Sequence, residues 1–130
     1  MKKSAIFALV VFAISLSAFA APSTKVCFFA GGDLGEKGDR ILATIASTKI
    51  KVQNLKGESA WEGVHTRKAK DLIKGKDGKT YLDFYYGGDE GCNTILVDAN
   101  LLRNTTTGLI KFRCRGEGFG ETVFFCRDNQ

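Results

Sequence analysis

Histidine is scarce in this chain of 130 residues. The chain has a single histidine, His65, and no two cysteines form a C-x-x-C motif, so ligands for a zinc site are few. No serine lies in a G-x-S-x-G context, heptads and collagen-like repeats are missing, and we identify no cofactor motif. These absences exclude a large cofactor enzyme, a collagen and a coiled coil. We expect the histidine at the surface or at a strand edge, because basic residues surround it in the sequence.

Long apolar runs are also absent, except at the beginning of the chain. Lys2-Lys3 precedes an apolar run over residues 5–16, and Ala18-Phe19-Ala20 follows it. This order of basic, apolar and small residues is typical of a secretory signal peptide. We therefore predict a signal peptide over residues 1–20 and a single domain over residues 21–130, located in the periplasm or outside the cell. Removal of the predicted signal peptide takes away Lys2 and Lys3 and lowers the formal net charge from +5 to +3, a mild basic excess.

Four cysteines form an even set behind the predicted signal peptide, which favours two disulfides over a metal site or a catalytic thiol. They are Cys27, Cys92, Cys114 and Cys126. Residues 109–115 and 121–127 have the pattern of hairpin arms around a turn centred near Gly118, which places Cys114 too far along the ladder from Cys126 for a disulfide. Of the two pairings that remain, we favour the one that joins the ends of the domain. It pairs Cys27 with Cys126 and Cys92 with Cys114.

Most of the remaining sequence alternates as short strands do, between glycine-rich or polar turns. Residues 21–25 are predicted to be a mobile leader and residues 26–30 a first strand. The segment Lys76-Asp77-Gly78-Lys79 has the composition of a turn between hairpin arms. Further strands are predicted over residues 49–53, 80–86, 94–97, 109–115 and 121–127.

Two segments fit either a helix or a strand. Residues 41–48 have an apolar face at helical spacing but are short and rich in threonine and alanine. Over residues 59–74, Ser59 and Glu62 have the spacing of a capping box, whereas Gly63 and the residues that follow it disfavour a helix. Both conformations stay open for these segments.

The overall pattern predicts a mainly β domain. We expect a small antiparallel barrel or sandwich of about seven to eight short strands, stapled by two disulfides. Residues 98–103 fit a single helical turn, so one short helix is compatible with this fold. An α+β domain is the alternative.

Three loops combine glycine with acidic residues, and two of them have Gly-Gly-Asp after an aromatic strand end. If the loops met at one end of a barrel, their carboxylates could bind calcium or supply the acid and base of a glycan hydrolase. No EF-hand spacing is present, and tight solvated turns require the same residue types, so turn chemistry is the favoured interpretation. The acids concerned are Asp33, Glu36, Asp89, Glu90, Glu117 and Glu121.

Basic residues form two groups, one over residues 67–79 and one on strand 109–115. In that strand the residues Ile110, Phe112 and Cys114 alternate with basic ones, which predicts a core face and a cationic outer face. The two groups could bind an acidic protein or an anionic glycan, although solvated faces are the simpler interpretation. Nucleic acid is not expected as a partner of an exported protein. The candidate binding residues are Arg67, Lys68, Lys70, Lys111, Arg113 and Arg115, together with Tyr81.

The segment Asp77-Gly78-Lys79-Thr80-Tyr81 is similar to a loop of bacterial periplasmic lysozyme inhibitors, in which a polar, glycine-containing loop lies near a tyrosine. The likeness covers these residues alone, and Asp77 stands where that family has a serine. The resemblance implies a loop that reaches into the cleft of a hydrolase.

The sequence therefore predicts a non-enzymatic binding module of the cell envelope whose partner is a protein or an anionic glycan. Inhibition of a wall-degrading hydrolase such as lysozyme is a narrower form of this function. A small hydrolase that uses loop carboxylates is the alternative outside it.

Overall fold

The computed structural model describes residues 22–57, 61–67, 72–85, 94–114 and 120–129. Within them the chain forms nine strands and one short 3₁₀-helix, η1. The elements are β1 (Ser23–Gly32), β2 (Arg40–Ile45), β3 (Lys49–Lys56), β4 (Gly63–Arg67), β5 (Ile73–Lys74), β6 (Thr80–Tyr85), β7 (Thr94–Asp98), η1 (Ala99–Leu102), β8 (Gly108–Cys114) and β9 (Gly120–Asp128).

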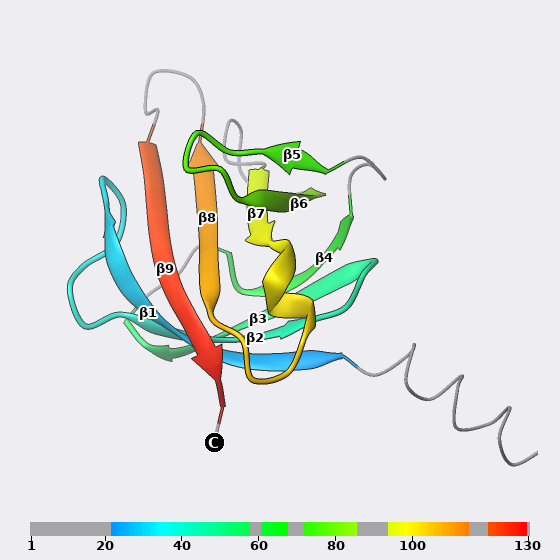
Figure 1. Cartoon of the computed structure of the whole chain (residues 1–130). Helices are drawn as coiled ribbons and strands as arrows, with labels where there is room; N and C mark the ends of the chain where they lie inside the picture. Colours follow the sequence, from blue (N-terminus) through cyan, green and yellow to red (C-terminus); the bar gives the residue numbers. More distant parts are fainter. Residues whose placement is uncertain (1–21, 58–60, 68–71, 86–93, 115–119, 130) are drawn as a thin grey trace, which may run out of the picture.

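Eight of the strands form a closed antiparallel barrel (Figure 1). Neighbours follow the order β1, β2, β3, β4, β6, β7, β8, β9, and β9 pairs back with β1. The extra strand β5 lies beside one end of β6, where Ile73 is opposite Tyr81. The prediction of a mainly β antiparallel barrel is confirmed, and the sandwich and α+β alternatives do not describe this fold.

Two segments near the beginning of the barrel are more regular than expected. Residues 23–25, predicted as part of a mobile leader, are the start of β1, and Lys25 is buried there. The ambiguous segment 41–48 is a strand as far as Ile45, because alternate side chains from Ile41 onward pack into the core. In the second ambiguous segment, residues 59–74, the described residues also include strands.

For the described part of residues 59–74, the interpretation as a helix is wrong. Residues 63–67 form β4, which pairs with β3, and residues 73–74 form β5. Pairing with β3 places His65 opposite Ile50 and buries both residues. Cross-strand packing therefore overrides the helical spacing of the apolar residues.

His65 is buried, contrary to the expectation of a surface position. The residue is 7% exposed, and its Nε2 lies 2.7 Å from the carbonyl oxygen of Trp61. Trp61 in turn stacks on Phe112, with 4.6 Å between ring centroids. The histidine thus belongs to the packed interior of the barrel.

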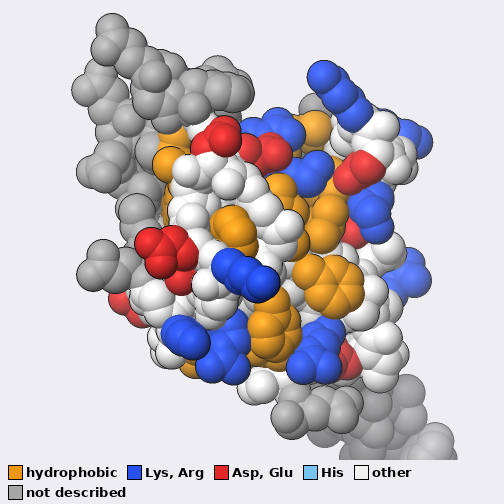
Figure 2. Space-filling model, turned by 90° about the vertical axis from the view of Figure 1, so that its left-hand side faces the viewer, with side chains coloured by type: hydrophobic (Ala, Val, Ile, Leu, Met, Phe, Trp, Pro, Cys, Tyr) orange, Lys and Arg blue, Asp and Glu red, His pale blue; other side chains and the backbone are white. Residues whose placement is uncertain are grey.

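The core is built from alternate residues of the barrel strands, and β8 shows the two faces that its sequence predicts. Its buried residues are Ile110, Phe112 and Cys114, and its outward residues include Lys111 and Arg113. Arg115, expected to continue the outward face, lies outside the described residues. Figure 2 shows one side of the outer surface, where Lys and Arg side chains surround hydrophobic ones.

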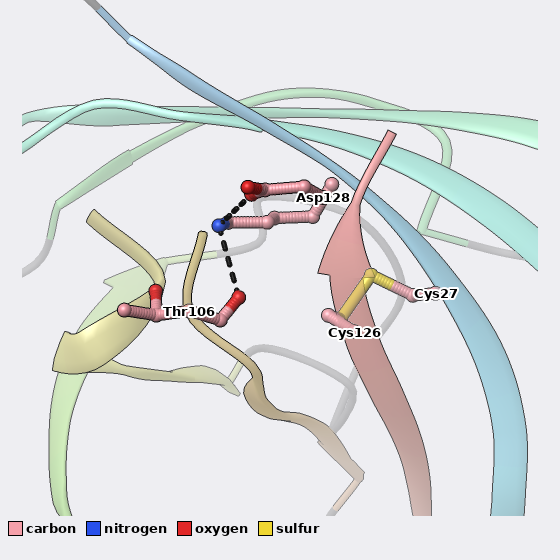
Figure 3. Close-up of a disulfide and its surroundings, with 5 residues drawn as sticks. Cys27, Thr106, Cys126 and Asp128 are labelled. Carbon is pink, nitrogen blue, oxygen red and sulfur yellow. Dashed lines mark hydrogen bonds and ion pairs between the residues drawn. A yellow bond between two sulfur atoms is a disulfide. The ribbon is translucent and has the colours of Figure 1, made fainter. Parts of the chain in front are cut away.

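A disulfide joins the first and last strands of the barrel. Cys27 and Cys126 face each other across β1 and β9, and their sulfur atoms are bonded (Figure 3). This confirms one of the two predicted pairs. Cys114 lies opposite Gly120 and Cys126 lies opposite Gly108, so these two cysteines are far apart along the ladder, as expected. Cys114 is disulfide-bonded as well, but Cys92 lies outside the described residues, and the pairing of these two stays a prediction.

We expect the protein without residues 1–20 to contain two disulfides and no free thiol. Alkylation without reductant should add no mass to the intact protein, and peptide mapping should recover Cys92 linked to Cys114. Reduction before alkylation is the positive control, because it exposes all four thiols. Mass added without reductant, or Cys92 linked to either other cysteine, would contradict this expectation.

A buried lysine closes the end of the barrel beside η1. Lys25 is fully buried, and its Nζ donates to the carbonyl oxygen of Arg103 at 2.8 Å. The same ammonium group donates to the carbonyl oxygen of Thr106 at 3.1 Å and to the carboxylate of Asp128 (Figure 3). All three donors of the ammonium group are used in this way. The Asp128 carboxylate also accepts the backbone N–H of Thr105, which has a φ of 63°. Lys25 and Asp128 together hold the connection between η1 and β8 against the barrel.

Candidate binding groove

The turn between β5 and β6 forms one wall of a groove on the outside of the barrel. The N–H of Gly75 donates to the carbonyl of Lys79 at 2.8 Å, and the N–H of Gly78 donates to the carbonyl of Gly75 at 3.0 Å. Gly78 has a φ of 82°, which glycine adopts without strain. At Gly75 a Cβ would lie 2.6 Å from Asp77 and 2.8 Å from the ring of Tyr81, so the close approach there needs glycine. The turn predicted at this place is confirmed.

Asp77 fastens the turn to the sheet. Its carboxylate accepts the hydroxyl of Tyr81 at 2.6 Å and the backbone N–H of Lys79 at 3.0 Å. The hydrogen bonds from Tyr81 and Lys79, with the nearby Lys111 ammonium, lower the pKa of Asp77 to about 2. Burial and the Asp77 carboxylate raise the pKa of Tyr81 well above its ordinary value. At neutral pH the tyrosine is therefore a neutral donor and the aspartate an anion.

Two cations from β8 lie along the same surface. The Nζ of Lys111 is 3.4 Å from the Asp77 carboxylate and 4.8 Å from the centroid of the Tyr81 ring. Two residues further along, the Nε of Arg113 donates to the carboxylate of Glu121 at 2.5 Å. Both side chains project outward, because Phe112 between them points into the core. The outer face of β8 thus supplies the second wall of the groove.

The groove itself is a hollow of about 440 Å³ between the β5–β6 turn and the outer faces of the neighbouring strands. Lys74 and Lys76 are exposed on its rim, and neither forms an ion pair with any described residue. Tyr81 and Leu96 contribute uncharged lining. Each of the two cations on β8 has one acidic partner, and the two rim lysines add positive charge to these pairs. Positive charge therefore exceeds negative charge in the groove.

The structure brings together some of the predicted binding residues and separates another. Tyr81, Lys111 and Arg113 share the groove. Arg67 is directed elsewhere, since its guanidinium donates to the carbonyl of Ser47 beyond the end of β2. Three further candidates lie outside the described residues, namely Lys68, Lys70 and Arg115.

Sequence reasoning missed the residues that organise the groove. Asp77 precedes Tyr81 by four residues across an Asp-Gly turn, and this spacing was the available signal for a side chain that bonds back across the turn. Leu96 had no such signal, and Glu121 was considered only as a loop acid, because only the pairing of β7 and β9 with β8 places them here.

The structure describes three of the six acids in the glycine-containing loops, namely Asp33, Glu36 and Glu121. Within the described part of the chain, no group of three or more His, Cys, Asp or Glu side chains could hold a metal ion. Glu121 pairs with Arg113, and the backbone N–H of Glu36 donates to Asp39 within its own loop. Three acids of the predicted loops lie outside the described residues, namely Asp89, Glu90 and Glu117.

Comparison of the chain with protein-family models, with curated proteins and with solved structures finds no match in any of the three. None of the described elements is a helix long and apolar enough to span a membrane. A proposal of function therefore depends on the chemistry of the groove.

Proposed function

We propose that the protein is a non-enzymatic binding module of the cell envelope that recognises an anionic partner, an acidic protein or an anionic glycan, in this groove. The observation that supports the proposal is the convergence of four cations on one concave surface. They are Lys74 and Lys76 beside the turn and Lys111 and Arg113 on β8. Cations that line a hollow with low-dielectric walls attract anions more strongly than the same charges on an open surface.

The ion pairs inside the groove leave room for an anionic ligand. The Asp77 carboxylate already accepts hydrogen bonds from Tyr81 and from the backbone of Lys79. Its distance of 3.4 Å from the Lys111 ammonium is long for a charge-assisted hydrogen bond. Lys111 can therefore turn a donor toward a bound carboxylate, sulfate or phosphate while Asp77 keeps its other partners.

Inhibition of a wall-degrading hydrolase is a narrower form of this function, and the exposed tip of the turn favours it. Lys76, Gly78 and Lys79 are exposed, while the hydrogen bonds of Asp77 hold the turn in one conformation. A preorganised turn loses little conformational entropy when it binds. Its lysines would complement the paired carboxylates in the cleft of a glycoside hydrolase.

Charge reversal of the two rim lysines is expected to weaken anion binding and leave the fold intact. The Lys74→Glu, Lys76→Glu variant should elute from immobilised heparin and from immobilised poly-L-glutamate at lower salt than the wild type. Its affinity, measured by calorimetry at low salt, should fall by about tenfold or more, because the field at the groove entrance changes sign. Thermal unfolding should be unchanged, since both side chains are exposed.

The matched control is Lys49→Glu, Lys51→Glu, which makes the same change in net charge at exposed positions of β3. It should bind both polymers nearly as well as the wild type. Equal loss in the two double variants would mean that net charge alone governs binding, and would exclude the groove. A wild-type protein that binds neither polymer at low salt would refute the proposed function.

A further inference from the structure

The outer faces of β8, β9 and β1 carry a row of apolar side chains outside the groove. Strand register places Leu109 opposite Phe125 and Phe125 opposite Phe28. All three point outward, because the residues that alternate with them face the core. Phe125 is 42% exposed, and leaving so much aromatic surface in water is unfavourable. Figure 2 looks onto this side of the barrel, where hydrophobic side chains gather between Lys and Arg.

Neighbouring positions widen the row into a patch. Val26 is outward on β1 and lies opposite Leu42 on β2, and Val123 is outward on β9. These three residues are half-buried, so partly exposed apolar side chains occur on four adjacent strands. Apolar patches of this kind with a polar rim mark interaction sites. The outer apolar patch comprises Val26, Phe28, Leu42, Leu109, Val123 and Phe125.

Two arginines lie at the outer apolar patch. The guanidinium of Arg127 lies over the ring of Phe28, with 5.1 Å between Cζ and the ring centroid. Arg40 lies directly opposite Phe28 on β2 and is exposed. Neither arginine takes part in the ion pairs that the described residues form. The patch thus combines aromatic surface with positive charge, and a carboxylate is its electrostatic complement.

We propose that the outer apolar patch is a second binding surface, and that its occupant is a protein segment presenting aliphatic or aromatic side chains together with carboxylates. Aromatic residues and arginine are the side chains enriched at protein interfaces and among their energetic hot spots. Arg127 is stacked on Phe28, which orients its planar fork of donors for a carboxylate. This surface uses none of the lysines on the groove rim.

Two other occupants fit the patch less well. A symmetric dimer of this chain would bring two copies of Arg40 and Arg127 together, and like charges repel across an interface. A membrane surface would need apolar rings free to enter the lipid. Because Arg127 covers Phe28, the guanidinium would have to be displaced or carried into an apolar layer at high cost. An acidic protein segment requires neither change.

Fluorescence anisotropy with two labelled amphipathic peptides tests this proposal. Both peptides carry leucine and phenylalanine on one helical face, and the other face is glutamate in one peptide and lysine in the other. The wild type should bind the glutamate peptide about tenfold or more tightly than the lysine peptide. Phe125→Ser and Arg127→Gln should each weaken that binding by about tenfold or more.

Matched controls come from β3, which lies outside the outer apolar patch. Leu55→Ser removes an apolar side chain that is 51% exposed, and Lys51→Gln removes an exposed positive charge. Each should change the affinity for the glutamate peptide by less than about twofold, since exposed residues outside an interface contribute little. A control that lowers affinity as much as its patch counterpart would overturn the proposal.

The groove variant Lys74→Glu, Lys76→Glu separates this proposal from the proposed function. Assayed at physiological salt, where binding through exposed groove charges alone is screened, it should keep most of its affinity for the glutamate peptide. Phe125→Ser should keep its affinity for heparin at low salt. Loss of peptide binding in the groove variant, or equal affinity of the wild type for both peptides, would overturn the proposal.

Two further results would also overturn it. Binding to phosphatidylglycerol vesicles that Phe125→Ser abolishes would assign the patch to a membrane, and dimerisation that Phe125→Ser abolishes would assign it to a second copy.

Discussion

Replacement of Phe112 by alanine is expected to lower the free energy of unfolding by about 3 to 5 kcal/mol. The ring is fully buried, stacks on Trp61 with 4.6 Å between centroids, and meets the edge of Phe124 at 5.7 Å. The substitution removes both aromatic contacts and leaves a cavity that a hydrogen-bonded barrel cannot easily collapse to fill. Stabilities of natural domains are only about 5 to 15 kcal/mol, so the loss is a large fraction of the whole. Urea unfolding, followed by the fluorescence of Trp61, the single tryptophan, measures it.

Lys51→Ala is the control for this measurement. The side chain is exposed on β3, and its removal should be nearly neutral. Lys111 on β8 is unsuitable as a control, because its ammonium contacts both Asp77 and Tyr81. A loss below about 1 kcal/mol at Phe112 would mean that its ring does not face the barrel interior.

Replacement of Lys25 by alanine is expected to be comparably destabilising, by about 3 to 5 kcal/mol. The variant lacks the fully buried ammonium group, which donates to the carbonyls of Arg103 and Thr106 and to the carboxylate of Asp128. The effect should also depend on pH. The hydrogen bond from Lys25 lowers the pKa of Asp128 below its ordinary value of 3.8, so the stabilisation is present above that pH and is lost as the pH falls through the lowered pKa.

Urea titrations of the wild type and of Lys25→Ala at pH 7 and at about pH 3 measure both effects, and the difference between the proteins should narrow at the lower pH. Arg103→Ala is the matched control, because it removes an exposed side chain and keeps the carbonyl that Lys25 contacts. That control should be nearly neutral. A difference that stays constant between the two pH values would contradict the ion pair with Asp128.

Strands whose two faces differ in polarity were predictable from the sequence. Ile50 and Val52 alternate with polar residues, and the inward residues of β8 alternate with outward ones. This period of two can be read from each segment alone. The segment 59–74 was not predictable in this way. Its apolar spacing suits a helix, and the deciding contact is the pairing of β4 with the preceding strand β3, which lies outside the segment and does not show in the spacing of its apolar residues.

The candidate site was predictable only in part, for a similar reason. Alternation along β8 indicates that Lys111 and Arg113 point outward, but their acidic partners come from other strands. Arg67 belongs to the same run of basic residues as the rim lysines, yet its hydrogen bond to Ser47 directs it away from the groove. Proximity in sequence is therefore a poor guide to which cations act together in this barrel.

The pairing of β1 with β9 constrains the order in which the chain can fold. Hairpins of adjacent strands close short loops, whereas the contact between Cys27 and Cys126 spans 99 residues of chain and costs more entropy to form. Until β9 pairs with β1, these two strands each present an open edge that can pair with a strand of another molecule. Closure is thus the late step and the one most exposed to aggregation. A chain without β9 would be an open sheet with two reactive edges, not a smaller barrel.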